Sequence, residues 1–400
     1  MTRKVCIVTG TRAEYGLLKG VIERVRSAPD LDLQLLVTGM HLSPEFGLTW
    51  REIADDGIAI DERVEILLSS DTAVGVSKAM GLGLIGIAEA YDRLRPDVVV
   101  LLGDRFEIFA AAAAALVAAI PIAHIHGGET TEGAIDEAFR HSVTKMAHLH
   151  FVAAAPYRDR VVQLGEDPAQ VFVVGGLGID AMDRVERMDR AELEDSLGFA
   201  IGPRHLLITF HPPTIDGRDP VTQLDELLAA LETVDQDTHL LFTLPNADTG
   251  GRALIARIEA FAAGRPDVHA VASLGQRRYF SALALAEGVV GNSSSGLLEA
   301  PSLGVGTVNI GDRQAGRLRA SSVIDCAPER ESIEAALKTL FSPAFRDNLR
   351  DVRSPYGEGG ASRRIVEVLR TAALGSLLKK TFHDLPQTAP GTSTGDGDHG

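Results

Sequence analysis

Residues 98–110, VVVLLGDRFEIFA, contain the transition that decides the fold. Five consecutive apolar residues, three of them β-branched, are typical of a strand buried on both faces of a parallel sheet, and Gly103 ends it. Asp104, Arg105 and Glu107 follow at once, before a helical alanine-rich run. Charges at the end of a buried strand are costly to bury unless they are paired or bind a ligand. The stretch therefore predicts a strand, a site-bearing loop and a helix. An Asp–Arg pair that only caps the helix is the alternative.

Similar apolar runs recur along the chain, each followed by a polar turn and a segment of helix length. They are residues 4–9, 32–38, 97–102, 121–125, 149–152, 171–174, 205–210, 239–244, 268–273, 288–291 and 306–310. Alternation of this kind indicates doubly wound parallel sheets. The pattern loosens after residue 183 and then resumes. We predict an α/β fold with two Rossmann-like doubly wound domains, residues 1–182 and 183–360, that face each other across a cleft.

The C-terminal part of the chain differs in composition. Residues 361–383 predict a helix that could pack on either domain. Residues 384–400 are rich in Pro, Gly, Ser and Thr and predict a disordered tail.

The overall composition excludes several classes of function. A net charge of −16 argues against a nucleic-acid surface, although a few local arginines could still hold an anionic small ligand. Two cysteines in separate apolar surroundings indicate neither a disulfide framework nor a zinc cluster. The apolar run 108–125 is broken by Pro121 and predicts a buried helix leading into a strand, because a membrane span needs about 20 uninterrupted apolar residues. We expect a soluble cytoplasmic protein without membrane or nucleic-acid partners.

A G-x-G-x-x-G motif occurs at Gly81–Gly86, GLGLIG. A dinucleotide-binding loop needs this motif between a strand and a helix start. Here the motif lies within a segment that reads as helical throughout, so we predict close helix packing rather than a nucleotide loop.

Residues 124–141, HIHGGETTEGAIDEAFRH, are the densest cluster of titratable groups. His124, His126 and Glu129 could bind a metal, but Gly127 and Gly128 suggest that the strand stops too early, and the spacing matches no standard metal site. We predict no metal. On the following helix Asp136 and Arg140 are four residues apart, as are Glu137 and His141, so each pair shares a face. Such pairs shift protonation and suit acid–base chemistry.

Two residues that follow predicted strands could contact an anion. Arg12 follows the first strand, where an arginine can clamp a phosphate with two donors. His211 follows another strand and is adjacent to two prolines, Pro212 and Pro213, which favours an imidazole presented as an acid, a base or a phosphate donor. A solvated helix-start arginine and a surface histidine are the alternatives.

The segment GVVGNSSSGLLEA, residues 288–300, predicts a phosphate site. Ser293 and Ser294 precede a predicted helix, where hydroxyls and free backbone N–H groups attract anions. Glu299 could accept hydrogen bonds from a ribose diol, and Arg313 could balance phosphate charge. Plain serine caps are the alternative.

Seven motifs in fixed order resemble the hydrolysing UDP-N-acetylglucosamine 2-epimerases of sialic-acid and legionaminic-acid pathways. They are TGTRAEYG (9–16), KAMGLGLIG (78–86), LLGDRFEIFA (101–110), HIHGGETTEGAIDEAFRHSVTKMAHLHF (124–151), TFHPPT (209–214), GNSSSGLLEAPSLGVGTVNIGDRQAGR (291–317) and YGEGGASRRI (356–365). The resemblance covers about residues 4–383.

The resemblance implies a GT-B-like two-domain fold, no cofactor, no metal, and a homodimer or homotetramer that takes a nucleotide sugar. It implies inversion at C2 with loss of UDP, which yields a free manno-configured sugar. The C2 proton is not acidic, so anti elimination of the nucleotide to a 2-acetamidoglucal, followed by hydration, is the expected route. This route needs an acid or base near C2, a proton donor near the glycosidic oxygen, and cations at the diphosphate. A GT-B glycosyltransferase, a non-hydrolysing epimerase and a nucleotide-sugar sensor are the alternatives.

The resemblance also assigns roles to the candidate residues. The catalytic set is Asp104, His126, Glu129, Asp136, Glu137 and His211, with Asp104 and Asp136 as acid–base groups. The substrate-binding set is Arg12, Arg105, Ser293, Ser294, Glu299 and Arg313, of which Arg12 and Arg313, with His211, would face the diphosphate. Related enzymes that act on N-acetylglucosamine itself can carry Glu where this chain has His126. The substrate is UDP-N-acetylglucosamine or a UDP-2,4-diacetamido-2,4,6-trideoxyglucose, and HIHGGE (124–129) with TEGAIDE (131–137) favours the second.

Overall fold

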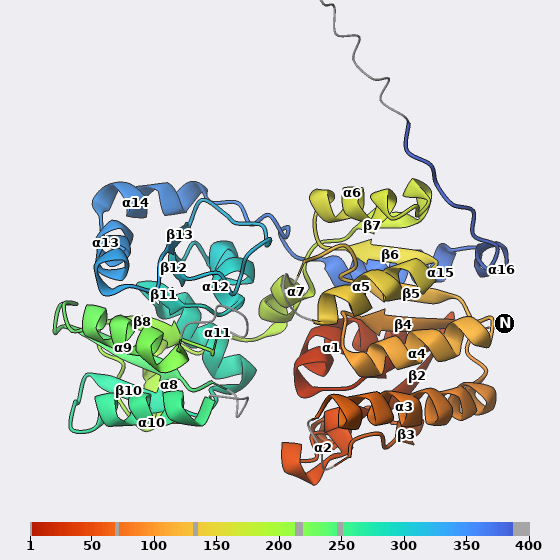
Figure 1. Ribbon diagram of the computed structural model, residues 1–400, viewed down its shortest axis with the longest axis horizontal. Helices are drawn as coiled ribbons and strands as arrows, with labels where there is room; N and C mark the ends of the chain where they lie inside the picture. The colour runs from red at the N-terminus through yellow and green to blue at the C-terminus, as the bar shows by residue number, and fades with distance from the viewer. Residues whose placement is uncertain (1, 69–71, 131–134, 213–218, 246–250, 387–400) are drawn as a thin grey trace, which may run out of the picture.

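The computed structural model describes residues 2–68, 72–130, 135–212, 219–245 and 251–386, and it contains two parallel sheets (Figure 1). The first sheet has the order β3-β2-β1-β4-β5-β6-β7. Its strands are β1 (Arg3–Thr9), β2 (Leu31–Thr38), β3 (Glu62–Val64), β4 (Val98–Leu102), β5 (Ile122–Ile125), β6 (Leu149–Val152) and β7 (Val171–Val173). We call this sheet and its helices the first lobe.

The second sheet has the order β10-β9-β8-β11-β12-β13. Its strands are β8 (Arg204–Thr209), β9 (Thr238–Thr243), β10 (Val268–Val271), β11 (Gly288–Gly291), β12 (Thr307–Ile310) and β13 (Val323–Cys326). This second lobe repeats the topology of the first six strands of the first lobe. In each lobe the order reverses once, between β1 and β4 and between β8 and β11, and ligands of such sheets bind beyond the carboxyl ends of the strands at that reversal. The prediction of two doubly wound domains is confirmed.

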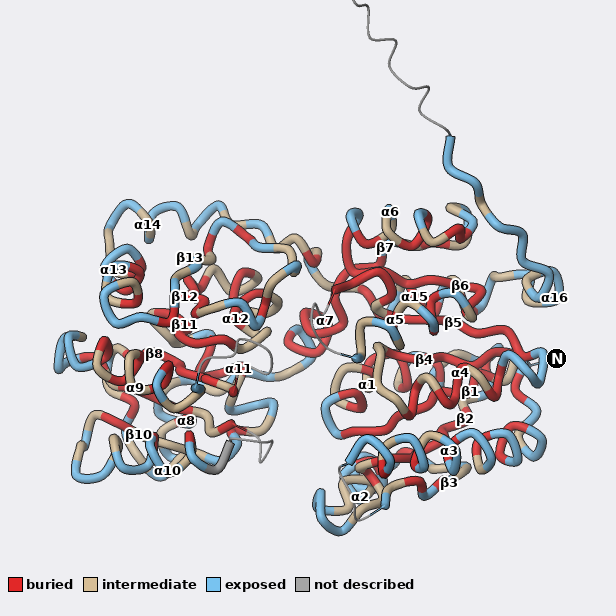
Figure 2. The backbone as a smooth tube through the Cα atoms, in the orientation of Figure 1, coloured by how far each residue is buried: buried red, intermediate tan, exposed pale blue. Residues whose placement is uncertain are grey.

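Alternating residues of the buried strands supply both faces of the first sheet. Val5 and Ile7 pack under α1 and α15, whereas Cys6 and Val8 pack under α3 and α4. Figure 2 shows buried backbone along the central strands of both lobes and exposed backbone on the outer side of α3. The helices of the first lobe are α1 (Arg12–Ser27), α2 (Trp50–Asp55), α3 (Ala73–Leu94), α4 (Phe106–Val117), α5 (Ile135–Met146), α6 (Ala155–Gln163) and α7 (Leu177–Arg184), with 3-10 turns η1 (Gly39–Leu42), η2 (Pro44–Phe46) and η3 (Pro168–Gln170).

The helices of the second lobe cover its sheet in the same way, and one cluster of apolar side chains joins the two lobes. Val152 and Met182 share this cluster with Leu207 and Val289. The helices are α8 (Arg190–Leu197), α9 (Pro220–Leu231), α10 (Gly251–Ala262), α11 (Gly275–Leu285), α12 (Ser295–Leu298), α13 (Arg330–Leu340) and α14 (Pro343–Asn348), with η4 (Ala300–Leu303) and η5 (Leu349–Asp351).

The chain returns to the first lobe at its C-terminal end. Helix α15 (Ala361–Thr371) packs on α1 and α7, and its Ile365 and Leu369 join the core beside β1. The N-terminus of α15 has no side-chain cap of its own, because Gly360 precedes it. Asp180 of α7 accepts hydrogen bonds from the backbone N–H groups of Ala361 (2.7 Å) and Ser362 (2.6 Å) instead. The predicted helix thus packs on the first lobe.

The C-terminal helix is broken once. Helix α15 ends at Thr371, and α16 (Leu374–Leu377) follows. At this break the Arg3 guanidinium donates hydrogen bonds to the carbonyls of Leu369 and Ala372. The tail predicted at 384–400 lies outside the described residues from 387 onward. The domain boundary at 182/183 stays a proposal: α7 packs on α1, whereas α8 packs on α11.

The glycine-rich motif at 81–86 lies inside α3, as predicted. An added Cβ at Gly86 would lie 2.6 Å from Cγ1 of Val64, and one at Gly83 would touch Ala110 at 3.4 Å. These two glycines let α3 approach its neighbours closely, while Gly81 meets nothing. Among the described helices α3 is long and apolar enough to cross a membrane. Its inner face packs in the core with α4, so its length and composition are weak evidence for a membrane-spanning helix. The run 108–125 forms α4 and β5, as predicted.

Candidate active site

The candidate catalytic residues of the first lobe follow β4 and β5 or lie on the first turn of α5, and His211 follows β8 in the second lobe. Asp104 sits two residues beyond the end of β4, and Arg105 is the residue before α4. Arg140, near the middle of α5, donates to the carboxylate of Asp104 and also to the carbonyl of His126 (2.9 Å). Arg140 therefore holds the loops after β4 and β5 together.

Asp104 has the electrostatic setting of a proton-transfer group. Its side chain is 17% exposed, and burial raises its pKa above the usual range. The positive charge of Arg140 opposes this rise, and the negative charges of Asp136 and Glu129 add to it. A carboxyl group whose pKa is raised by burial, and which is still paired with a cation, can gain or lose a proton near neutral pH.

The two histidines of the H-x-H sequence diverge. His124 is fully buried in β5, with Nε2 at 2.8 Å from the carbonyl of Gly103 and Nδ1 at 3.2 Å from Oγ1 of Thr144. Burial lowers its pKa to about 3, so it is neutral. It ties the end of β4 to α5 and has a structural role.

His126 comes after the strand has ended, as the following glycines predicted. Its φ of +65° turns the backbone into the left-handed region, which directs its ring away from that of His124. Nδ1 lies 3.2 Å from Oε1 of Glu129, and Nε2 accepts the N–H of Leu177 at 3.4 Å. Burial lowers the pKa of His126, and the charge of Glu129 opposes that shift. The imidazole of His126 is therefore neutral at neutral pH.

Helix α5 carries the remaining candidate acids of this lobe. The predicted pair of Glu137 and His141 is present, with Nε2 at 3.0 Å from Oε1. Asp136 is half-buried, and its charge acts on both Asp104 and Arg105. Among the described residues no cluster of three His, Cys, Asp or Glu side chains is arranged to hold a metal ion.

Arg105 is positioned by buried acids. Its Nε donates to Oε1 of Glu107 at 2.7 Å, and Glu107 is fully buried. Glu14 of α1 lies beside this pair and accepts the N–H of Gly10 at 2.8 Å. Burial and then the charge of Glu107 raise the pKa of Glu14. The single guanidinium therefore compensates two neighbouring carboxyl groups, which fixes its direction.

In the second lobe Asn292 joins the loops at the reversal of strand order. Its Oδ1 accepts the N–H of His211 at 2.7 Å, and its Nδ2 donates to the carbonyl of His211 at 2.8 Å. Arg313 (3.2 Å) and Gln314 (2.9 Å) both donate to the carbonyl of Asn292. The side-chain amide of Asn292 thus joins the loops after β8 and β11, and its backbone carbonyl adds the loop after β12. Pro213, one of the two prolines after His211, lies outside the described residues.

The predicted helix after the serines is a single turn. Ser293 and Ser294 are half-buried and precede α12, which ends at Leu298. Pro301 has no backbone N–H to continue an α-helix, and the chain passes into the 3-10 turn η4. The Oγ of Ser293 accepts the N–H of Ser295 at 3.4 Å. Serine hydroxyl groups could therefore bind an anion here, but α12 is too short to contribute the dipole of a long helix.

Glu299 lies against the other lobe. An added Cβ at Gly178 of α7 would come within 2.6 Å of Oε1 of Glu299, so the glycine is needed for this approach. Oε2 of Glu299 is buried without a hydrogen-bond partner among the described residues, and burial raises its pKa to about 7. Such a carboxyl is ready to accept hydrogen bonds from a ligand hydroxyl.

Sequence reasoning did not assign a role to Arg317. Its positive charge lowers the pKa of Glu299 within its own lobe and those of Asp104 and His126 in the first lobe, opposing or adding to the larger effect of burial at each. Arg317 is thus a cation of the second lobe whose charge reaches the candidate acid–base residues of the first lobe. The last arginine of the quoted motif ending in GDRQAGR was the available signal. Arg12, by contrast, begins α1, is 54% exposed on its side chain and pairs with Glu52 at 3.0 Å.

A tyrosine pair closes the seam between the lobes beside Arg317. The hydroxyls of Tyr157 and Tyr356 are 3.2 Å apart, and Leu318 donates its N–H to Tyr157 (3.5 Å) while its carbonyl accepts from Tyr356 (3.2 Å). This seam fixes the segment that carries Arg317 relative to the first lobe.

Two doubly wound lobes, with acids at one reversal of strand order and amide, hydroxyl and guanidinium groups at the other, define a two-lobed enzyme of the α/β class. The sequence profile of the UDP-N-acetylglucosamine 2-epimerase family matches residues 23–370. The chain belongs to this family.

Individual relatives agree with this assignment. The GDP/UDP-N,N'-diacetylbacillosamine 2-epimerase (hydrolyzing) of Campylobacter jejuni is 37% identical over 96% of this chain and 99% of its own length. Polysialic acid biosynthesis protein P7 of Escherichia coli is 34% identical over 96% and 98%. The crystal structure of the Neisseria meningitidis UDP-GlcNAc 2-epimerase bound to UDP-GlcNAc superposes with a TM-score of 0.71 at 21% identity, over 92% of this chain and 99% of that one.

Proposed function

We propose that this protein is a hydrolysing 2-epimerase that converts a UDP-2-acetamido sugar and water into UDP and the free manno-configured sugar, for nonulosonic (sialic or legionaminic) acid biosynthesis. The observation that carries the proposal is Asp104, a half-buried carboxyl held by Arg140 and reached by the charge of Arg317 from the other lobe. That combination supports a proton-transfer group in the first lobe that faces a cation of the second lobe. The hydrolysing relative of C. jejuni supports the reaction type.

The first step is elimination. Asp104 or Asp136 takes the proton from C2 while the C1–O bond breaks, and the electron pair passes to the diphosphate. The C1–C2 double bond of a 2-acetamidoglucal forms. Negative charge develops on the diphosphate, where Arg317 and Arg313 stabilise it. A base at C2 therefore acts together with cations at the leaving group.

The second step is hydration. Water adds its oxygen to C1 of the glucal, and C2 receives a proton on the face opposite to the one it lost. The His126–Glu129 pair, 3.2 Å apart, supplies and accepts protons for this step. Its burial lowers the pKa of the imidazole, so a neutral ring can relay protons near neutral pH. Both steps need acid–base chemistry alone, so the proposal includes no cofactor or metal.

The second lobe would hold the nucleotide. Ser293, Ser294 and Arg313 would bind the phosphates, with His211 presented by its backbone bonds to Asn292. The unpaired Oε2 of Glu299 would accept from the ribose. Arg12 is bound to Glu52 on a solvent-exposed surface, so it would have to exchange partners to reach the diphosphate.

The test uses the purified protein in D2O with each candidate nucleotide sugar and no added metal, followed by phosphorus and proton NMR. We expect UDP release and a free manno sugar deuterated at C2, and the same rate with a chelator present. Unchanged spectra with every candidate would contradict the proposal. UDP release that occurs only when an acceptor is added would indicate a glycosyltransferase, and retained UDP-sugar with C2 exchange would indicate a non-hydrolysing epimerase.

We also propose that the protein is a cytoplasmic homo-oligomer, a homodimer or homotetramer. Helix α3 buries one face and leaves Val74 (64%), Leu82 (43%) and Ile85 (62%) exposed on the other. A second copy of this chain would cover such a face. Light scattering should give a multiple of the 42.6 kDa chain mass, and Ile85→Asp should shift it toward one chain. A wild-type monomer at micromolar concentration would contradict this.

A further inference from the structure

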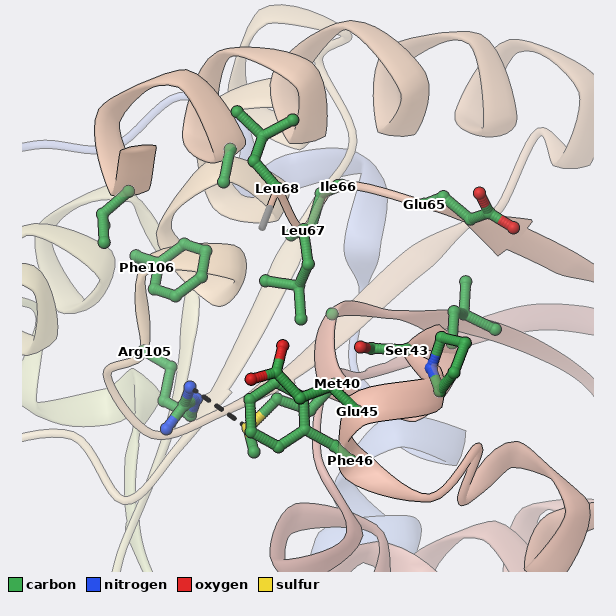
Figure 3. Close-up of a pocket in the computed structure, with 15 residues that line it drawn as sticks. Met40, Ser43, Glu45, Phe46, Glu65, Ile66, Leu67, Leu68, Arg105 and Phe106 are labelled. Carbon is green, nitrogen blue, oxygen red and sulfur yellow. Dashed lines mark hydrogen bonds between the residues drawn. The ribbon is translucent and has the colours of Figure 1, made fainter. Parts of the chain in front are cut away.

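The end of the chain crosses the first lobe on the side away from the second lobe. After α16, residues 378–386, which we call the C-terminal strap, run past the C-terminal ends of α5 and α6 (Figure 1). The candidate acids and the cavity of about 630 Å³ beside Arg105 (Figure 3) lie instead beyond the carboxyl ends of the strands. A residue of the C-terminal strap therefore acts on the candidate site only through other parts of the lobe.

Phe382 and His383 hold the C-terminal strap on the lobe. The Phe382 ring lies against Gly165, whose φ is +85°, and an added Cβ at Gly165 would collide with the ring. The N–H of His383 donates to the carbonyl of Gly165 at 3.0 Å. Nζ of Lys145 on α5 lies 4.7 Å from the centre of the Phe382 ring. These contacts bring Lys380 to the end of α5.

The ammonium group of Lys380 makes three polar contacts. Its Nζ donates to the carbonyls of Lys145 (2.8 Å) and Ala147 (2.5 Å), at the C-terminal end of α5, and lies 2.6 Å from Oε2 of Glu166. Carbonyls in the last turn of a helix have no partner within the helix, and a positive charge there also complements the helix dipole. Lys380 thus caps α5.

Glu166 anchors this cap to the sheet. Its side chain is 2% exposed, and its Oε2 is 3.0 Å from Nε2 of His150 in β6. Its Oε1 accepts from Lys145 at 2.8 Å. Burial opposes ionisation of this carboxyl, but the hydrogen bonds from His150, Lys145 and Lys380 outweigh burial and lower the pKa of Glu166 to about 2. The carboxylate is therefore charged at neutral pH and fixes Lys380 relative to β6.

Helix α5 depends on such polar contacts for its position. Of its three buried side chains, Arg140, Val143 and Thr144, only Val143 is apolar. Arg140 donates to the carboxylate of Asp104, and Oγ1 of Thr144 lies 3.2 Å from Nδ1 of His124. The helix has 12 residues and is about 18 Å long, short enough to move as one rod. A shift at its C-terminal end therefore also moves Arg140.

We propose that Lys380 is a positioning residue for the candidate active site, because its cap on α5 sets the place of Arg140 and, through Arg140, that of Asp104. The inference rests on the proposed function, in which Asp104 transfers a proton. Without the cap, the last carbonyls of α5 turn to water and the contact between Arg140 and Asp104 loosens. A reacting group displaced by about 1 Å can cost a factor on the order of 100 in rate.

The first test replaces the ammonium group and leaves Glu166 with its two other partners, Lys145 and His150. We expect Lys380→Met to lower kcat about tenfold and to change KM and the affinity for UDP less than about twofold, because the second lobe holds the nucleotide. The number of UDP sites per chain, from calorimetry, corrects kcat for unfolded molecules. Lys380→Arg should restore kcat, since a guanidinium can donate to the same carbonyls. Lys379→Met, at the exposed neighbouring residue, is the matched control and should keep wild-type kcat.

The pH profile separates positioning from a loss of stability. Burial raises the pKa of Asp104 and the charge of Arg140 lowers it, and the other charges that act on it are those of Asp136, Glu129 and Arg317. A looser contact with Arg140 raises this pKa further, and a base is active only above its pKa. The acidic limb of the profile of kcat/KM should therefore move to higher pH in Lys380→Met and stay in place in Lys379→Met.

Three results would overturn the positioning role. They are wild-type kcat in Lys380→Met, a loss of kcat that Lys380→Arg does not restore, and a loss of kcat with an unmoved acidic limb. If Lys380→Met does not fold, Phe382→Ala takes its place, because this side chain is 64% exposed and its loss detaches the C-terminal strap. The same fall in kcat and the same shift of the limb are expected, and wild-type kinetics would reject the role.

A measurement without turnover distinguishes this inference from the proposed function. If wild-type protein releases UDP from no nucleotide sugar, the proposed function fails, and hydrogen–deuterium exchange of residues 135–147 then decides the role of Lys380. Faster exchange along the whole of α5 in Lys380→Met, relative to Lys379→Met, supports positioning. Unchanged exchange, or a change confined to the last turn of α5, rejects it.

Discussion

The segment after β4 in the first lobe carries Asp104 and Arg105, whereas the segment after its counterpart β11 in the second lobe carries Asn292 and Ser293. The two strands occupy the same place in the same strand order. In the first lobe these side chains are ionisable, and burial raises the pKa of Asp104. In the second lobe a neutral amide fixes backbone loops around hydroxyl groups. Under the proposed function, one topology supports proton transfer in one lobe and anion binding in the other, and only local residues decide which.

Among the variants considered, removal of the Asp104 charge should have the largest effect, because it should abolish proton transfer in the first lobe and leave anion binding in the second. We expect Asp104→Asn to lower turnover about 10²- to 10⁴-fold, because a positioned acid or base contributes that factor, while calorimetric affinity for UDP stays close to wild type. Asp97→Asn is the matched control, since Asp97 lies just before the other end of β4 and accepts the N–H of Lys4 at 2.8 Å. Full turnover by Asp104→Asn would remove the catalytic role of the first lobe.

Removing the amide of Asn292 should affect the second lobe in the complementary way. Asn292→Ala leaves the His211 N–H and carbonyl without partners, so we expect UDP affinity to fall about tenfold and the free energy of unfolding to fall by about 1–3 kcal/mol. Asn309→Ala, on the adjacent strand β12, loses its 2.7 Å bond to Asp325 and should cost stability without changing UDP affinity. If both variants bind UDP equally, Asn292 does not organise the nucleotide site.

The smallest effect concerns pH and the contact between the lobes. Burial raises the pKa of Glu299 to about 7, above the roughly 4.3 of an unfolded Glu. The folded state therefore binds more protons than the unfolded state between these values, and the free energy of unfolding should decrease as pH rises through this window, by at most about 1.4 kcal/mol per pH unit. Glu299→Gln should flatten this part of the profile in urea titrations. An unchanged slope would mean that Glu299 is solvated when folded.

The buried strands could be predicted from the sequence because each is a continuous apolar run. Two of the four edge strands of the described sheets, β3 (ERV) and β13 (VIDC), were not predicted. Each is three or four residues long and carries charge, because an edge strand is paired on one side only. Local patterns cannot detect a strand that exists only through its neighbour.

Among the candidate site residues, one local pairing could be predicted from the sequence and another could not. The spacing on α5 predicted Glu137 with His141, which is present, and Asp136 with Arg140. Arg140 instead has Asp104 as a partner, 36 residues away. That contact depends on how α5 lies over β4 and β5, which no local spacing encodes. The approach of Arg317 to the first lobe likewise depends on the seam of Tyr157 and Tyr356.

The return of α15 to the first lobe has a consequence for assembly during translation. Domains generally fold as they emerge, from the N-terminus onward. Here the part of α1 that packs on α15 stays uncovered until Ile365 and Leu369 have been synthesised, after every strand of the second lobe. The backbone N–H groups of Ala361 and Ser362 can then donate hydrogen bonds to the carboxylate of Asp180 in α7, which has already been synthesised and is buried in the folded protein. A nascent chain that stops before residue 361 thus carries a complete second lobe beside an unfinished first one, so the lobe that is made first is the lobe that matures last.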